Sequence, residues 1–158
     1  MNTQTRASFL FLRLAMGFLF LYAGLSKVTN PDWSAAGFLN GAKTLAPLFH
    51  WFALPSNIGW VNALNEWGLT LLGASLIFGI CVRLSSKLGI VLMLLYYIPG
   101  LDGLYPNTHA FVVDEHIIYI AVLALFASFR VGRFWGFDGW WVERLGEPVA
   151  PAWYRILG

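Results

Sequence analysis

The sequence predicts an all-α integral membrane protein, a four-helix bundle with an interfacial helix between its first two spans. Three observations predict it: an apolar composition, four apolar stretches, and basic residues gathered on alternate connections. Of the 158 residues, 58% are hydrophobic and 11% are charged, with a mean hydropathy of +0.65. Soluble domains carry about a quarter charged residues. The composition excludes a disordered chain, a coiled coil and an ordinary cytosolic enzyme, and predicts one transmembrane domain over residues 1–158.

A helix that crosses a bilayer needs about 20 mostly apolar residues. Four stretches approach this length, namely residues 8–27, 59–81, 84–98 and 112–129. The third stops at Pro99, which cannot continue a helix without losing a hydrogen bond. A cleaved signal peptide is the alternative for the first stretch. Against it, no small-x-small cleavage site follows, and Lys27 leads directly into an aromatic loop.

The connection between the first two stretches contains an interfacial segment, residues 33–52, that is rich in apolar and aromatic side chains. Such side chains are costly in a freely solvated loop, so we expect a helix from Trp33 to Ala46, ended by Pro47 and lying at the membrane surface. The helix would act as a lid over the mouth of the bundle or simply as an interfacial anchor.

Basic residues set the predicted orientation. They gather before the first stretch, between the second and third, and after the fourth, with Lys27 and Lys43 alone on the opposite connections. The positive-inside rule then places both termini in the cytoplasm. We therefore expect a multi-pass protein of the cell (inner) membrane. The tail, residues 130–158, carries Trp135, Trp140, Trp141 and Trp153, and we expect it to form a short surface helix there.

Composition also limits the partners and redox chemistry of the chain. A net charge of +2 with scattered basic residues gives no nucleic-acid surface. The single cysteine, Cys81, excludes an internal disulfide, a C-x-x-C pair and a covalent haem motif. Any redox chemistry therefore requires a bound cofactor.

Ionisable residues within the apolar stretches form the candidate site. A charge deep in the hydrocarbon costs about 2.5–3.5 kcal/mol even on lenient scales, so it usually has a partner or a task. We predict one outward-facing cluster with Glu66, Glu115 and His116 as catalytic groups and Lys27, Asn62, Trp67 and Tyr119 as substrate-binding groups. A carboxyl and an imidazole whose pKa values are brought together can exchange protons near neutral pH. A quinone site needs such groups, because both ring oxygens take up a proton on reduction.

Other interpretations of these residues remain open. A salt bridge from Lys27 to Glu66 or Glu115 would explain the same charges structurally. A metal site built on His109, Asp114, Glu115 and His116 has poor ligand spacing, and we expect no metal and a solvated His109. Arg13 lies near the end of its stretch, so we expect it to anchor the helix by extending to the interface.

Several motifs resemble the DoxX-like family of membrane proteins, and its DoxD branch in particular. These are Arg13-Leu-Ala-Met-Gly17 through Lys27, Glu66-Trp67-Gly68, Val113-Asp114-Glu115-His116, Gly132-Arg133 and Gly136-Phe137-Asp138. The resemblance covers about residues 9–141. It implies a four-helix membrane subunit of a thiosulfate:quinone oxidoreductase, passing electrons from a sulfur compound to membrane quinone beside a DoxA-like subunit.

Two other functions compete with this one. The chain would otherwise be a non-catalytic scaffold or accessory subunit for a partner redox protein. A small-solute transporter is a third possibility. Alternating access needs two parts that move against each other, and four spans without an inverted repeat do not supply them unless the chain forms a homo-oligomer.

Overall fold

The computed structural model describes residues 1–145, which form helices and no β-strand. The helices are α1 (Thr3–Val28), α2 (Ala36–Asn40), α3 (Ala46–Phe52), α4 (Ile58–Phe78), α5 (Val82–Gly100), α6 (Glu115–Phe129) and α7 (Phe137–Leu145), with a 3₁₀ turn, η1 (Val131–Arg133), before α7. The all-α class is confirmed, and each predicted apolar stretch corresponds to one long helix. The predicted bounds differ, because α4 ends at Phe78, α5 continues through Pro99 to Gly100, and α6 begins only at Glu115. The predicted tail helix corresponds to α7, whereas residues 146–158, with Trp153, lie outside the described residues.

Length and composition allow two of the described helices, α1 and α5, to cross a membrane. Helix α6 is apolar but has only 15 residues. Helix α4 has 21 residues, and Asn62, Asn65 and Glu66 lower the hydropathy of its first half. That all four helices span a bilayer stays a prediction.

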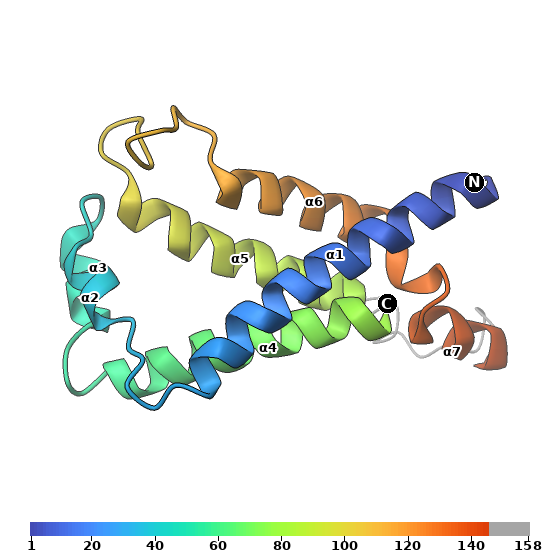
Figure 1. Ribbon diagram of the computed structural model, residues 1–158, viewed down its shortest axis with the longest axis horizontal. Helices are drawn as coiled ribbons and strands as arrows, with labels where there is room; N and C mark the ends of the chain where they lie inside the picture. The colour runs from blue at the N-terminus through green and yellow to red at the C-terminus, as the bar shows by residue number, and fades with distance from the viewer. Residues whose placement is uncertain (146–158) are drawn as a thin grey trace.

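Helices α1, α4, α5 and α6 lie side by side along the long axis of the molecule (Figure 1). Helices α2 and α3 and the loop 101–114 lie at one end, called the loop end below. The N-terminus and α7 lie at the other, called the tail end. The connections between successive long helices therefore alternate between the loop end and the tail end, as expected.

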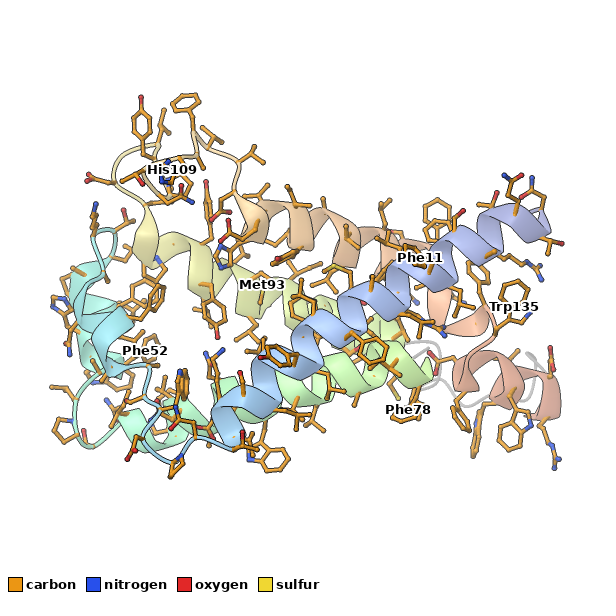
Figure 2. The ribbon with its side chains drawn as sticks, in the orientation of Figure 1. Phe11, Phe52, Phe78, Met93, His109 and Trp135 are labelled. Carbon is orange, nitrogen blue, oxygen red and sulfur yellow. The ribbon has the colours of Figure 1, made fainter. Side chains whose placement is uncertain are left out.

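Apolar side chains fill the space between these helices and also cover their outer faces. Met93 lies inside the bundle, whereas Phe11 points outward (Figure 2) and is 75% exposed. The interior is lined by Met16, Phe20, Leu69, Leu72, Leu76, Val82, Met93, Leu123, Phe126 and Val131. Exposed large apolar side chains on the long helices include Phe18, Tyr22, Leu71, Leu88 and Ile118. An apolar exterior of this extent indicates contact with lipid.

The closest helix contact in the bundle joins α1 to α4 through glycines. A Cβ atom added to Gly17 would lie 2.8 Å from Ile77 Cγ1, and one added to Gly24 or Gly73 would collide with the backbone of Thr70 or Leu21. Small residues let helices approach until their backbones touch, which is how helices associate in lipid, where apolar burial gives no net gain. Gly24 and Gly73 therefore fix the register of α1 against α4.

A matched pair of substitutions within α4 tests this contact. Gly73→Ala should lower the free energy of unfolding by about 1–3 kcal/mol because the new methyl group meets the backbone of α1. Gly59→Ala should leave stability unchanged or raise it by up to about 1 kcal/mol, since nothing lies within 4 Å of the added atom. Thermal unfolding of the purified protein in detergent measures both. Equal effects of the two substitutions would contradict the assigned register.

The expected single helix from Trp33 to Ala46 is wrong, because residues 33–52 form two short helices, α2 and α3. Leu45 adopts a left-handed conformation (φ 54°), which separates α2 from α3. Pro47 lies in the first turn of α3, where a missing N–H costs nothing, so it begins a helix instead of ending one. Ala35, Leu39 and Phe49 bury their side chains against the loop end of the bundle.

Arg13 also differs from the prediction, because it does not extend to the interface. Its side chain is 1% exposed. Nη1 donates to the carbonyl oxygens of Val131 (2.9 Å) and Phe134 (3.3 Å), and Nη2 donates to that of Trp135 (3.4 Å). Arg13 thus binds the segment between α6 and α7 to α1, a contact across more than 100 residues that composition does not reveal.

Asp138, on α7, completes this network at the tail end. Its carboxylate accepts hydrogen bonds from the backbone N–H groups of Cys81 (2.8 Å) and Val82 (3.1 Å). These groups lie at the start of α5, where N–H donors lack intrahelical partners, and Cys81 supplies no side-chain cap. Asp138 therefore caps α5 from a distant helix. Burial raises the pKa of Asp138, against the opposing effects of the two N–H donors, Arg13 and Arg133.

We expect Arg13→Gln and Asp138→Asn each to lower the free energy of unfolding by about 2–4 kcal/mol, because each leaves buried polar groups without a partner. The double variant should lose at least 0.5 kcal/mol less than the sum, since both residues hold the same segment. Thermal unfolding in detergent measures the cycle, with Lys87→Gln as the control for an exposed cation at the same end. Strict additivity would show that the two residues act independently.

Candidate functional site

Tyr96, on α5, is at the centre of a polar cluster at the loop end. Its hydroxyl donates a hydrogen bond to Asn65 Oδ1 on α4 (2.7 Å). Its ring stacks on that of His116 from α6, with 5.7 Å between centroids and an interplanar angle of 17°. Lys27 Nζ, from α1, lies 6.0 Å from the same ring centroid. One half-buried side chain therefore contacts all three neighbouring long helices.

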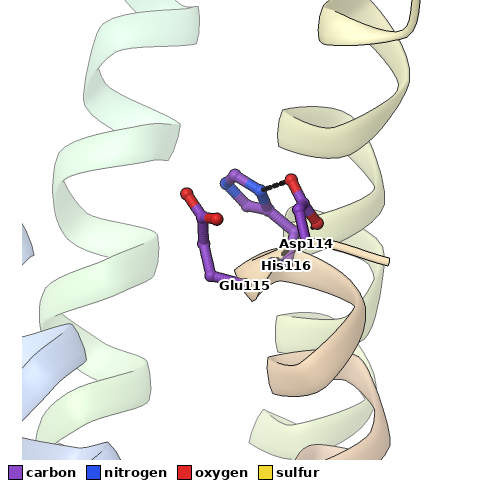
Figure 3. A group of neighbouring side chains, drawn as sticks. All are labelled: Asp114, Glu115 and His116. Atoms are coloured by element: carbon purple, nitrogen blue, oxygen red, sulfur yellow. Dashed lines mark hydrogen bonds and ion pairs between the residues drawn. The ribbon is translucent and has the colours of Figure 1, made fainter. Parts of the chain in front are cut away.

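His116 is held by the residue that begins α6. Asp114 is the N-cap, and its Oδ1 accepts from the backbone N–H of His116 (3.0 Å) and of Ile117 (3.3 Å). Its Oδ2 lies 2.8 Å from His116 Nδ1. Figure 3 shows that this pairing turns the other ring nitrogen away from Asp114, toward the side on which Glu115 lies. The imidazole is thus oriented by a buried carboxylate, the arrangement that suits a proton donor or acceptor.

Asp114, Glu115 and His116 place one ligand atom each within 4.8 Å of one another. Helix capping engages Oδ1 of Asp114 and the His116 ring engages Oδ2, which accounts for this proximity without an ion. His109 is exposed in the loop, as expected, and belongs to no such group within residues 1–145.

Lys27 is paired with aromatic rings and a carbonyl. Its Nζ lies 5.3 Å from the ring centroid of Trp33 and donates to the carbonyl oxygen of Ala23 (3.3 Å). Aromatic faces attract a cation without neutralising it. Within the described residues, no salt bridge joins Lys27 to Glu66 or Glu115, so the alternative of a structural ion pair is wrong. The positive charge remains available to an anion.

Asn62 and Glu66, both on α4, have different surroundings. Asn62 Oδ1 accepts from the backbone N–H of Ala35 (3.0 Å), and its Nδ2 donates to Ser34 Oγ (3.3 Å), which positions the segment before α2 over the bundle. Glu66 is half-buried, and its carboxylate makes no hydrogen bond or ion pair within the described part of the chain.

The two remaining predicted residues, Tyr119 and Trp67, lie in different surroundings, one inside the bundle and one on its outer surface. Tyr119 contacts His116 (6.4 Å between ring centroids) and Phe20 (5.7 Å), inside the bundle. Trp67 is 53% exposed on α4. Sequence reasoning missed Tyr96 and Asn65 as site residues, although Asn65 adjoins Glu66 and Tyr96 lies one turn before Pro99.

Two apolar spaces lead to this cluster. A cavity of about 90 Å³ beneath α2 and α3 is lined by Phe38, Phe49, Trp60, Asn65 and Tyr96 among others. A groove of about 550 Å³ runs between α4 and α5. Leu64, Leu92 and Leu95 line both spaces. A hydrophobic ligand therefore has an apolar path along the bundle surface to the Tyr96 hydroxyl.

The DoxX family model matches residues 8–98 of the chain, more than half of its length. The chain belongs to the DoxX family. No curated protein and no solved structure matches it. In this DoxX protein the matched residues include Lys27, Asn65 and Tyr96 and both walls of the groove, whereas the Asp114–His116 pair lies beyond the match. The family is confirmed, and the DoxD branch stays a prediction.

Proposed function

We propose that this DoxX protein is a DoxD-like membrane subunit that passes electrons from a sulfur compound such as thiosulfate to membrane quinone at its loop end. The observation that carries the proposal is the position of the Asp114-held His116 against Tyr96, at the end of an apolar groove. The proposal includes four spanning helices in a cell membrane and both termini in the cytoplasm.

The residues at the loop end fit the chemical character of a quinone. The groove between α4 and α5 would hold an isoprenoid tail, and the cavity beside Tyr96 would admit the ring once the half-exposed Phe38 ring, 6.0 Å away, swings aside. His116 would donate a hydrogen bond to one ring oxygen, and the Tyr96 hydroxyl would donate to the other after releasing Asn65 Oδ1, its acceptor in this structure. Ligand sites are typically apolar spaces with a few such polar groups.

The overall reaction balances in electrons and protons. Two thiosulfate anions lose one electron each and join through a new S–S bond, and reduction of one quinone to quinol consumes these two electrons and two protons. His116 donates one proton and is reprotonated from solvent through Asp114 and Glu115 at the mouth of the bundle. The second proton comes through the Tyr96 hydroxyl, which gives up its proton to the quinone and takes another from solvent at the mouth of the bundle. Lys27 attracts the anionic donor.

Histidine substitutions test the proposal. His116→Ala should lower thiosulfate-dependent reduction of a soluble quinone analogue by at least about a hundredfold, the usual contribution of a proton-transfer group. His109→Ala, which removes an exposed histidine from the neighbouring loop, should have no effect. The thermal unfolding midpoint, measured alongside, separates lost chemistry from lost folding. Equal activity of the two variants would remove His116 from the mechanism.

Quinone retention tests the binding step separately. Protein purified from membranes in a mild detergent should carry quinone, measured after solvent extraction. Tyr96→Phe keeps the ring contacts but deletes the hydroxyl, and should weaken retention about tenfold. Tyr22→Phe, the same change at an exposed position of α1, should not change it. Wild-type protein with neither bound quinone nor activity would favour the alternative function, a non-catalytic scaffold for a partner redox protein such as a DoxA-like subunit.

A further inference from the structure

A third pocket lies at the tail end, far from the site described above. Its volume is about 620 Å³, and its lining includes Arg6, Phe78, Arg133, Trp135, Trp140 and Glu143. Phe78 and Trp135, both labelled in Figure 2, lie at this end of the molecule. The walls come from α1, the last turn of α4, and the segment from η1 to α7, which the Arg13 and Asp138 contacts hold in place.

Charge is distributed unequally between the two ends. At the tail end the described residues include seven basic side chains, Arg6, Arg13, Arg83, Lys87, Arg130, Arg133 and Arg144, against two acidic ones, Asp138 and Glu143, which leaves +5. At the loop end two basic side chains, Lys27 and Lys43, face five acidic ones, Asp32, Glu66, Asp102, Asp114 and Glu115, which leaves −3. The tail end is therefore the end that attracts anions.

The surroundings of the tail-end pocket are aromatic as well as basic. Trp135, Phe137, Trp140 and Trp141 expose between 42% and 58% of their surface. Arg6 lies 5.8 Å from the ring centroid of Phe134, and Arg144 lies 5.0 Å from that of Trp140. Exposed indole rings next to the end of a spanning helix are typical of the headgroup level of a bilayer. Helices with an aromatic face and basic residues lie in that plane.

We propose that this pocket binds the phosphodiester headgroup of an anionic phospholipid, such as phosphatidylglycerol. Arg6 and Arg133 supply guanidinium groups, which match phosphate oxygens in charge and geometry. The exposed rings of α7 lie against the upper acyl chains. Glu143, also in the lining, repels the phosphate and sets an upper limit on the affinity.

A lipid titration of the purified full-length protein in a neutral detergent tests this site. Binding of dioleoylphosphatidylglycerol is followed by native mass spectrometry and by the thermal unfolding midpoint. Wild-type protein should bind this lipid at least tenfold more tightly than dioleoylphosphatidylcholine. Inorganic phosphate and glycerol phosphate, tested up to millimolar concentration, should not raise the midpoint. Equal binding of the two lipids, or stabilisation by phosphate alone, would overturn the proposal of a lipid site.

Charge variants locate the site. Arg6→Gln should weaken phosphatidylglycerol binding about fivefold, the effect of one basic side chain near an anionic surface. Glu143→Gln should tighten it by a similar factor. Lys43→Gln removes one positive charge at the loop end and should change nothing. Arg6 is exposed in the first turns of α1, so its loss should not affect folding. If Arg6→Gln and Lys43→Gln bind alike, the tail-end pocket is not the site.

Discussion

The backbone contact between α1 and α4 positions both polar regions of this DoxX protein. Gly24 against Thr70 and Gly73 against Leu21 fix the register of the two helices. One turn beyond Gly24 this register brings Lys27 to the level of Asn65 and Tyr96. Three turns in the other direction it brings Arg13 beside the turn between α4 and α5, where Gly79 lies against its guanidinium group. A shift along this contact would disturb both ends together.

Two cations inside this apolar chain make their hydrogen bonds and ring contacts to neutral groups. Arg13 donates to three carbonyl oxygens, and Lys27 contacts two aromatic rings and a carbonyl oxygen. An isolated charge in hydrocarbon is expensive, and backbone carbonyls and ring faces lower that cost while leaving the net charge intact. The consequence differs between the two residues. Arg13 has 1% exposure and can only hold structure, whereas Lys27 is half-buried beside the mouth of the bundle and can still attract an anion.

Hydropathy alone predicted the four long helices, α1, α4, α5 and α6, because length and apolar content depend on local sequence. It failed wherever a distant residue decides the outcome. Arg13 was expected at the interface, since nothing in its neighbourhood shows that carbonyls more than 100 residues later surround it. The sequence predicted a helix end at Pro47, whereas Pro47 lies in the first turn of α3. A proline is tolerated in the first turn and interrupts a helix in a later one, and the local sequence does not show which turn it occupies. The polar cluster was predicted from its charges, and Tyr96 was missed because a tyrosine in an apolar stretch carries no distinctive signal.

The family match divides the proposed quinone site into two parts with different physical tasks. Residues 8–98 contain the apolar groove, the Tyr96–Asn65 hydrogen bond and the Lys27 charge, which are features for holding a lipid-soluble ligand. The titratable pair, Asp114 and His116, comes from the start of α6, and it reaches the ligand space only by stacking on Tyr96. Under the proposed function, binding and proton transfer would rest on different elements, joined at one ring contact. Loss of His116 should therefore stop turnover while the groove still accepts its ligand, a separation that a purely structural role for the cluster does not produce.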